Sequence, residues 1–238
     1  MEPLQRRIAL VTGANRGIGL EIARQLAVRG FHVWMAARDL RKAAAVAQEL
    51  AVDGRMVDAV QLEVTRSESA LAAAAAIQSR CGRLDVLVNN AGVLMDRQQP
   101  PSLTPPDVLR STMETNVIGV LKVTRSLLPL LRESGRGRVI NISSGGGQLA
   151  DMMSSVWAPA YQISKTALNA LTMLLAGELK PQGISVNVIC PGWCRTEMGG
   201  ESAPNSAEQG ADTAVWLATE APAELTGKFF RNRQEIPW

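Results

Sequence analysis

Short apolar runs alternate along the chain with alanine-rich segments, and this rhythm limits the available folds more than any other feature of the sequence. The apolar runs have the length of β-strands and lie at residues 8–11, 32–37, 59–64, 85–90, 138–143, 185–190 and 227–230. The segments between them have helical periodicity and lie at residues 18–29, 40–51, 67–80, 107–132, 160–180 and 206–218. Parallel strands need long crossover connections, which are normally helices. The sequence therefore predicts an α/β fold: a doubly wound parallel sheet of about seven strands with helices on both faces.

The composition of the chain argues against several classes of function. The chain of 238 residues is 46% apolar and 20% charged, which fits one globular domain over residues 1–238. Its net charge is only +3 and its aromatic content 4%, so we expect no nucleic-acid partner. The apolar run near the N-terminus is too short for a signal peptide core, and no window approaches the length of a membrane span, so we expect a cytoplasmic protein without membrane contacts. Cys81, Cys190 and Cys194 lack companions for a metal site, so no metal is expected.

The sequence TGANRGIG at residues 12–19 joins the first predicted strand to the first predicted helix. Its glycines, Gly13, Gly17 and Gly19, permit a tight turn and close approach of the backbone to a diphosphate, while the helix N-terminus supplies amide donors. The spacing differs from the general G-x-G-x-x-G fingerprint, and a structural glycine turn is the alternative. Ligands of doubly wound sheets bind at the carboxyl ends of strands. The loop therefore favours a Rossmann-type dinucleotide-binding domain.

The end of the second predicted strand bears on the choice of dinucleotide. An NAD site carries an acidic residue there for the ribose hydroxyl, but this chain has Ala37 followed by Arg38. Arg38 and Arg16 of the glycine loop are suited to a 2′-phosphate, which guanidinium groups bind through charged, forked hydrogen bonds. We therefore expect NADP(H) as the cofactor. The alternative is that both arginines are solvated, with Asp39 compensating Arg38.

Tyr161 is the only tyrosine of the chain, and Lys165 follows it in the sequence YQISK. On a helix, residues four apart lie on one face, so both side chains can enter one cleft. A nearby ammonium favours the phenolate and lowers the pKa of a phenol from its usual value near 10. A tyrosine so tuned can act as general acid or base toward a carbonyl. For an isolated motif the alternative is a buried tyrosine beside a lysine that extends to solvent.

Six motifs stand in order along almost the whole chain: TGANRGIG (12–19), NNAG (89–92), TNVIG around Asn116, NISS (141–144), YQISK (161–165) and PGWCRT (191–196). In this order they resemble the short-chain dehydrogenase/reductase family. The resemblance implies a catalytic set of Asn116, Ser144, Tyr161 and Lys165. The cofactor contacts that it implies, together with the two arginines, are Gly13, Asn15, Arg16, Gly17, Ile18, Gly19, Arg38, Glu63, Val64, Asn90, Ala91, Gly92, Tyr161, Lys165, Pro191, Gly192 and Thr196.

Within this family, the serine at the position of Ser144 hydrogen-bonds the substrate carbonyl, and the residue at Asn116 holds a water that serves the lysine. Glu63 departs from the family pattern, because relatives usually carry an aspartate there. Ser143 and Asn89 are expected to support the sheet. Tryptophan and methionine side chains near the expected site form either an apolar pocket with the 145–160 loop or part of the core; they are Met152, Met153, Trp157, Trp193 and Met198.

The C-terminal segments resemble the carbonyl-reductase branch of the family. This implies an NADPH-dependent oxidoreductase that transfers a hydride to a small, largely apolar ketone, aldehyde or quinone, with Tyr161 as general acid/base. A 3-oxoacyl or hydroxysteroid-type dehydrogenase remains an alternative. A catalytically silent nicotinamide-binding sensor or interaction protein is a second class of hypothesis, against which the complete catalytic set argues. By resemblance we expect a homodimer or homotetramer formed through the helices at 107–132 and 160–180.

Overall fold

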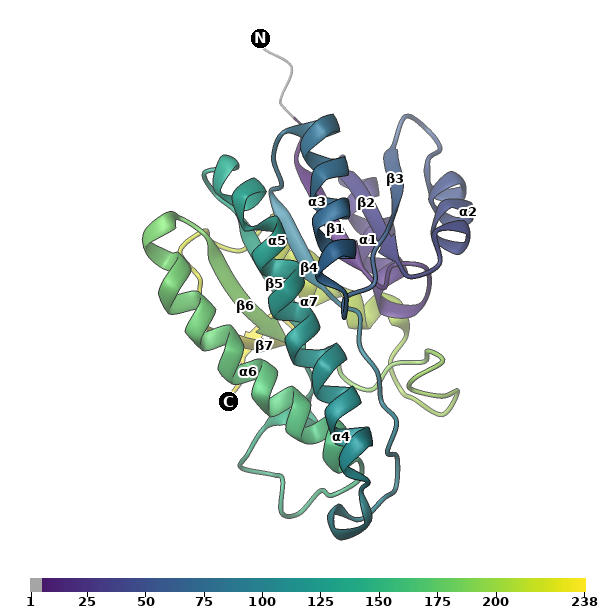
Figure 1. The fold of residues 1–238 in the computed structure, drawn as a ribbon, viewed down its shortest axis with the longest axis vertical. Coiled ribbons are helices and arrows are strands. Elements are labelled where there is room, and N and C mark those ends of the chain that lie inside the picture. Colours follow the sequence, from purple (N-terminus) through teal and green to yellow (C-terminus); the bar gives the residue numbers. More distant parts are fainter. Residues whose placement is uncertain (1–5) are drawn as a thin grey trace.

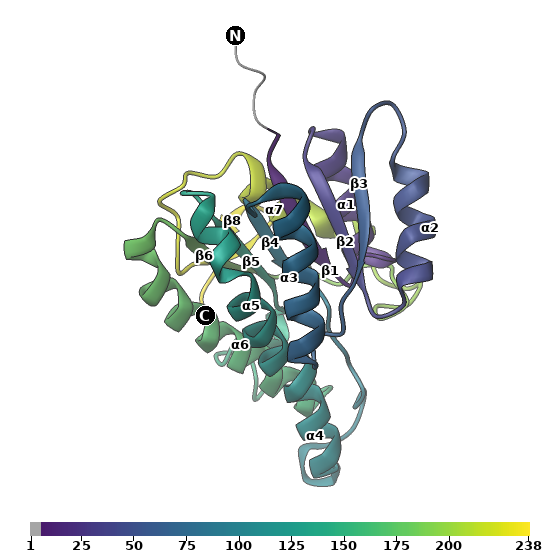
Figure 2. The ribbon, with the colours of Figure 1, turned by 45° about the horizontal axis from the view of Figure 1, so that its top comes forward.

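The computed structural model describes residues 6–238 and contains one sheet, so residues 1–5 of the expected domain lie outside the described part. The strand order is β3-β2-β1-β4-β5-β6-β7-β8 (Figure 1 labels β1 to β7, and Figure 2 labels β8). Neighbouring strands from β3 to β7 pair in parallel, and only β8 is antiparallel. The strands are β1 (Ile8–Thr12), β2 (His32–Ala37), β3 (Met56–Gln61), β4 (Val86–Asn89), β5 (Arg138–Ile142), β6 (Ser185–Ile189), β7 (Phe229–Arg231) and β8 (Gln234–Glu235).

Helices cover both faces of the sheet, as predicted (Figures 1 and 2). On one face lie α1 (Gly17–Val28), α2 (Leu40–Leu50) and α7 (Ala207–Thr219). On the other lie α3 (Ser67–Cys81), α5 (Gly119–Glu133) and α6 (Pro159–Leu179), with α4 (Pro106–Met113) leading into α5. The predicted doubly wound α/β fold is therefore confirmed, with one short antiparallel strand beyond the expected seven.

Alternating side chains of the strands fill the two halves of the core. In β1, Val11 packs with the α1 and α7 residues Ile22 and Ala214. Its neighbour Leu10 points to the opposite face and packs with Leu127 of α5. Successive strand residues face opposite sides, so a sheet covered on both faces needs apolar residues at consecutive positions. This is why the central strands read as unbroken apolar runs.

Two elements differ from the sequence prediction. The third strand occupies 56–61 rather than 59–64, because Asp58 lies within it and pairs with His32 of β2 at 2.7 Å, so a charged residue interrupts the apolar run. The expected helix at 107–132 is interrupted by a π-helical turn, Glu114–Ile118. There the amide of Gly119 donates to the carbonyl of Glu114, five residues earlier. Such turns occur most often at functional sites.

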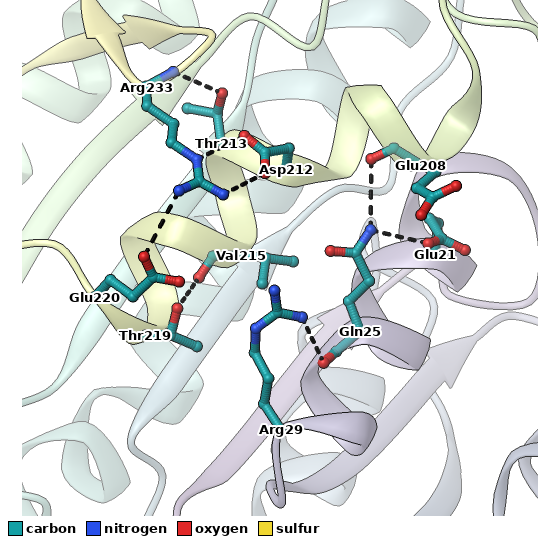
Figure 3. A network of polar contacts seen from close by, with 10 residues as sticks. All are labelled: Glu21, Gln25, Arg29, Glu208, Asp212, Thr213, Val215, Thr219, Glu220 and Arg233. Carbon is teal, nitrogen blue, oxygen red and sulfur yellow. Dashed lines mark hydrogen bonds and ion pairs between the residues drawn. The ribbon is translucent and has the colours of Figure 1, made fainter.

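Polar contacts fix the C-terminal hairpin on α7 (Figure 3). Asn232 and Arg233 both have positive φ (50° and 60°) and form the two-residue turn between β7 and β8. The Arg233 guanidinium binds both carboxylate oxygens of Asp212 at 2.5 and 2.8 Å, and its amide donates to the Thr213 hydroxyl. A bidentate pair of this kind fixes orientation as well as position. The hairpin therefore holds Arg231, the last residue of β7, in a defined place.

Candidate active site

The loop between β1 and α1 forms an amide-lined cradle at the carboxyl edge of the sheet, where the strand order reverses between β1 and β4. Gly13 and Gly17 have φ of +63° and +57°, which favours glycine. A Cβ at Gly19 would overlap the side chain of Asn90 and the carbonyl of Gly13. No side chain caps α1 and its first turn carries no acidic residue. Its free amides and positive dipole end are thus available to an anion.

Hydrogen bonds tie this cradle to the segment after β4. The amides of Asn90 and Ala91 donate to the Thr12 hydroxyl at 2.9 and 3.0 Å, and Asn90 Nδ2 donates to the Thr12 carbonyl at 2.9 Å. A Cβ at Gly92 would lie 3.7 Å from Lys165 Nζ. The structure thus brings the 12–19 and 90–92 motifs together and places Lys165 beside them.

The two arginines expected at a 2′-phosphate each have a carboxylate neighbour. Arg16 forms an exposed ion pair with Glu197. Arg38 Nε lies 3.8 Å from Glu63 Oε2, with 73% of the Arg38 side chain exposed. Glu63 is thus close to Arg38, and it also accepts a hydrogen bond from Thr65 Oγ1 at 3.1 Å. Both guanidinium groups are accessible, and an incoming phosphate would compete with these two acids.

The remaining predicted contacts fall into two groups. Thr196 faces the cradle, since a Cβ at Gly17 would lie 3.3 Å from Thr196 Cγ2. Gly192 has a φ of +78° and is closely approached by the Asn205 side chain. Val64, in contrast, is 7% exposed and packs in the core below Gly119. Three further predicted residues are partly exposed: Asn15 and Pro191 lie in the same loops, and Ile18 lies in the first turn of α1.

Tyr161 and Lys165 lie on one face of α6, as the four-residue spacing predicts. Lys165 Nζ is 5.4 Å from the centre of the Tyr161 ring and donates to the carbonyl of Ile142, at the end of β5, at 2.7 Å. Both residues are buried, with exposed fractions of 8% and 4%. The lysine does not extend to solvent, so the alternative of a snorkelling lysine is wrong.

The expected tuning of the tyrosine by the lysine is not found in the protein alone. Burial raises the pKa of Tyr161 to about 12, while a hydrogen bond from Ser144 and the charge of Arg97 act in the opposite direction. Burial lowers the pKa of Lys165 from 10.5 to about 8, with a smaller opposing effect of Cys190. Desolvation is the largest influence on the pKa of each group, and it disfavours the charged form of both. Tyr161 is therefore a protonated phenol at neutral pH.

Ser144 lies at the end of β5 next to the tyrosine. Its hydroxyl accepts a hydrogen bond from the amide of Gly146 at 3.1 Å and contributes to the pKa of Tyr161 by hydrogen bonding. Ser143 instead donates to Asn169 Oδ1 at 2.7 Å and is 1% exposed. The two serines therefore have different surroundings: Ser144 adjoins the phenol, whereas Ser143 links β5 to α6.

Asn116 lies within the π-helical turn and links three segments. Its Nδ2 donates to the Val93 carbonyl at 2.9 Å and to Ser164 Oγ at 3.0 Å, and its Oδ1 accepts from the Val93 amide at 2.8 Å. A Cβ at Gly92 would lie 3.3 Å from the same Oδ1. The side chain of Asn116 thus holds the loop after β4 against α6. It is not a solvent-facing helix amide.

Two residues that the sequence analysis did not single out position the tyrosine and its loop. Asp96 is fully buried and accepts hydrogen bonds from the amides of Ala160 and Tyr161, in the first turn of α6. Gln162 accepts from the amide of Trp157 at 3.1 Å and donates to the carbonyl of Ser155 at 2.7 Å. Asp96 lies far from α6 in sequence, so only the fold reveals its role.

The start of the loop between β5 and α6 is fastened to the same helix. Gly147 approaches α6 so closely that a Cβ there would overlap the backbone of Lys165. Its carbonyl accepts from Thr166 Oγ1 at 3.1 Å and from Asn169 Nδ2 at 3.3 Å. The loop is therefore held at its first residues by Gly147 and at its last by Gln162.

A cavity of about 220 Å³ opens at the segment that follows Ser144, and neither Ser144 nor Tyr161 is among the residues that line it. Its lining is more polar than expected and comprises Gly145, Gly146, Gln148, Asp151, Met152, Ser155, Trp157, Gln162 and Arg231. The Trp157 ring lies 5.6 Å from the Tyr161 ring, centre to centre. Of the five tryptophan and methionine candidates, Met152 and Trp157 line the cavity. The other three are not core residues, because Met153 is 96%, Trp193 52% and Met198 41% exposed.

Within residues 6–238, no group of three or more histidine, cysteine or acidic side chains is arranged to bind a metal. In the same part of the chain, no helix is long and apolar enough to cross a membrane.

The chain is similar to known proteins in both sequence and fold. A model of the short chain dehydrogenase family matches residues 7–207. The chain is 36% identical to short-chain dehydrogenase anuI of Penicillium roqueforti, over 99% of this chain and 98% of that protein. It is 32% identical to carbonyl reductase (NADPH) 1 of Sus scrofa, over 98% and 94%. The crystal structure of NADPH-bound carbonyl reductase from chicken fatty liver superposes with a TM-score of 0.89 at 29% identity, covering 99% of this chain and all of that one.

Proposed function

The chain belongs to the short chain dehydrogenase family, and from this premise we propose that it reduces the carbonyl of a small ketone, aldehyde or quinone with NADPH. The observation that carries the proposal is the placement of a buried tyrosine and lysine, side by side, next to an amide-lined cradle. Relatives named as NADPH carbonyl reductases, one of them with NADPH bound, support the choice of cofactor and reaction.

The cradle fits a dinucleotide by its shape and by its donors. The space above Gly19 and Gly13 excludes side chains, and α1 presents uncapped amides suited to the diphosphate. Exposed Arg38 and Arg16 suit a 2′-phosphate. Gly92, beside Lys165, and Thr196, facing the loop, would hold the ribose and the nicotinamide end. Bound NADPH would supply the hydride that reaches the carbonyl carbon.

The residues of this chain supply the proton. Reduction of a carbonyl leaves negative charge on its oxygen, which Ser144 and Tyr161 are positioned to receive as hydrogen-bond donors. The raised pKa of Tyr161 keeps the phenol protonated at neutral pH, which is the state required of a general acid. Lys165 lies one helical turn away and would restore the proton after each turnover, because its pKa of about 8 allows it to gain and lose protons near neutrality.

A test compares consumption of NADPH with a panel of ketones, aldehydes and quinones, in parallel with NADH and with the variant Tyr161→Phe. We expect NADPH-dependent reduction that the variant loses. A catalytically silent sensor would bind NADPH in calorimetry without consuming it on any compound. An acetoacetyl thioester and a steroid ketone in the panel identify a 3-oxoacyl or hydroxysteroid-type dehydrogenase. Equal catalytic efficiency with NADH would contradict the assignment of the arginines.

The assembly we propose is a homodimer or homotetramer formed through the α4–α5 helix pair and α6. Apolar side chains are exposed along α6, among them Met173 (50%) and Leu174 (73%), and Ile118 of the π-helical turn is 40% exposed. Exposed apolar surface on neighbouring helices supports association. Light scattering of the purified protein gives the mass directly, and a monomeric mass at micromolar concentration would contradict this assignment.

A further inference from the structure

Arg231 places a positive charge at a cavity that is connected to the candidate catalytic residues through Gly145 and Gly146, which follow Ser144, and through Trp157, whose ring lies against Tyr161. It is half-buried at the end of β7, and the cavity it lines also contains Gly145 and Gly146, the two residues after Ser144. Turn residues Asn232 and Arg233 follow it, and the contacts of Arg233 with Asp212 and Thr213 fix this turn on α7 (Figure 3). The guanidinium is thus carried by a rigid hairpin rather than by a loose loop.

The hydrogen-bonding capacity of this guanidinium is largely unused. Within the described part of the chain, its Nε is buried without a partner, and its Nη2 reaches only Gln148 Oε1, at 3.5 Å. Across residues 6–238, no carboxylate lies within 4.0 Å of Arg231, whereas Arg16 and Arg38 at the cradle each have an acidic neighbour. Partial burial of an arginine without a countercharge costs free energy of desolvation, and a bound anion that pairs with the guanidinium offsets this cost.

Gly145 and Gly146 leave room for the Arg231 guanidinium and the Trp157 ring close to Ser144. A Cβ at Gly145 would overlap Arg231 Nη2, and one at Gly146 would lie 3.2 Å from the Trp157 ring and 3.5 Å from Ser144 Oγ. The guanidinium therefore lies against the residue that follows Ser144. Covalent geometry limits the separation between Arg231 Nη2 and Ser144 Oγ to roughly 10 Å. One small molecule can span both groups.

We propose that Arg231 binds a carboxylate of the substrate, so that the protein acts preferentially on carbonyl compounds that carry an acid group several bonds from the carbonyl. This inference rests on the proposed function and narrows its substrate class. The carbonyl lies at Ser144 and Tyr161, the connecting part of the molecule packs on the Trp157 ring, and the carboxylate forms charged hydrogen bonds with Arg231. The substrate is apolar in its middle and anionic at one end.

Asp151 allows a test of whether the bound substrate is negatively charged. Among residues 6–238 it is the only carboxylate that lines the cavity; it is exposed, and it does not pair with Arg231. A substrate anion would be attracted by Arg231 and weakly repelled by Asp151. Removing the Asp151 charge should therefore strengthen the preference for acids, whereas removing the Arg231 charge should abolish it.

The experiment uses two aldehydes that differ only in charge, 4-carboxybenzaldehyde and its methyl ester, with NADPH and the full chain. We expect the wild type to favour the acid. Arg231→Gln should raise the KM for the acid roughly 10- to 100-fold with little change for the ester. Arg231→Lys should retain part of the preference, and Asp151→Asn should increase it. Calorimetry with 4-methylbenzoate, which has no reducible carbonyl, should show the same loss of affinity in Arg231→Gln.

The outcomes separate this inference from the proposed function. Reduction of both aldehydes by the wild type without preference for the acid would overturn the role of Arg231 and leave the reductase intact. An equal loss on both aldehydes in Arg231→Gln would also overturn it, since it would reflect structural damage. If neither aldehyde is reduced, the binding of 4-methylbenzoate still decides: affinity that depends on Arg231 supports the site, and its absence overturns it.

Discussion

Replacing Lys165 with methionine is expected to stabilise the fold while it removes activity. Lys165 is 4% exposed, its ammonium donates to the carbonyl of Ile142, and no carboxylate of residues 6–238 lies within 4.0 Å of it. Methionine has a similar length and carries no charge, so it can occupy the same space without desolvating an ion.

The size of the stabilisation expected for Lys165→Met follows from the pKa of Lys165. The lowering of the Lys165 pKa from 10.5 to about 8 corresponds to about 3 kcal/mol of unfavourable free energy at pH 7, since one pKa unit is worth about 1.4 kcal/mol. Loss of the hydrogen bond to Ile142 offsets about 1 kcal/mol. We therefore expect Lys165→Met to raise the free energy of unfolding at pH 7 by about 2 kcal/mol.

The direction in which the free energy of unfolding changes with pH is a second test of the buried Lys165 ammonium. The pKa of Lys165 is lower in the folded protein than in the unfolded chain, so between pH 8 and 10.5 the unfolded chain binds more protons. The free energy of unfolding of the wild type should therefore rise across this window. Between pH 7 and 9.5, below the titration of Tyr161, we expect a rise of about 2 kcal/mol that Lys165→Met lacks.

Urea unfolding at both pH values measures these quantities, with Lys42→Met as the matched control. Lys42 is exposed on α2, so its replacement should change stability by less than about 0.5 kcal/mol. A Lys165→Met variant less stable than the wild type at pH 7, or a wild type whose stability does not rise toward pH 9.5, would refute the account of a buried, uncompensated ammonium.

Three further predictions concern the proton donor and the cradle. Tyr161→Phe should unfold at nearly the same urea concentration as the wild type but lose turnover by orders of magnitude, because only the hydroxyl is removed; a variant that keeps most of its activity would exclude Tyr161 as the acid. Arg38→Gln should raise the KM for NADPH about tenfold, and Glu63→Gln should lower it because the competing carboxylate is gone; opposite signs in steady-state kinetics would contradict the 2′-phosphate site. Gly19→Ala should cost about 1–3 kcal/mol in thermal unfolding and weaken NADPH binding in calorimetry, since its methyl group overlaps the cradle.

Much of the fold could be predicted because it depends on periodicity, which the sequence states directly. The alternation of apolar runs with helical segments identified the doubly wound sheet and located most strands and helices to within a few residues. The third strand was displaced because Asp58, a charged residue within it, is matched by His32 on the neighbouring strand. A pairing between distant residues leaves no local signal.

The candidate site was predictable where motifs are contiguous and obscure where it depends on tertiary contacts. The spacing of Tyr161 and Lys165 correctly predicted a shared helix face, but burial, which reverses the expected change in the tyrosine pKa, is a property of the assembled core. Asp96 and Arg231 reach the site from segments with no sequence signature. Arg231 in particular lies among other charged residues in the closing segment, where nothing marks it as different.

The attachment of the loop to α6, through Gly147 at its start and through the contacts of Gln162 with Ser155 and Trp157 at its end, has a consequence for how such an enzyme can diversify. Because both ends of the intervening stretch are clamped to the helix that carries Tyr161 and Lys165, changes between residues 148 and 154 need not disturb the reacting groups. Met153, 96% exposed, already contributes nothing to packing there. Replacing this interval with foreign sequences of various lengths should yield variants that differ in substrate selectivity while their catalytic residues stay in place.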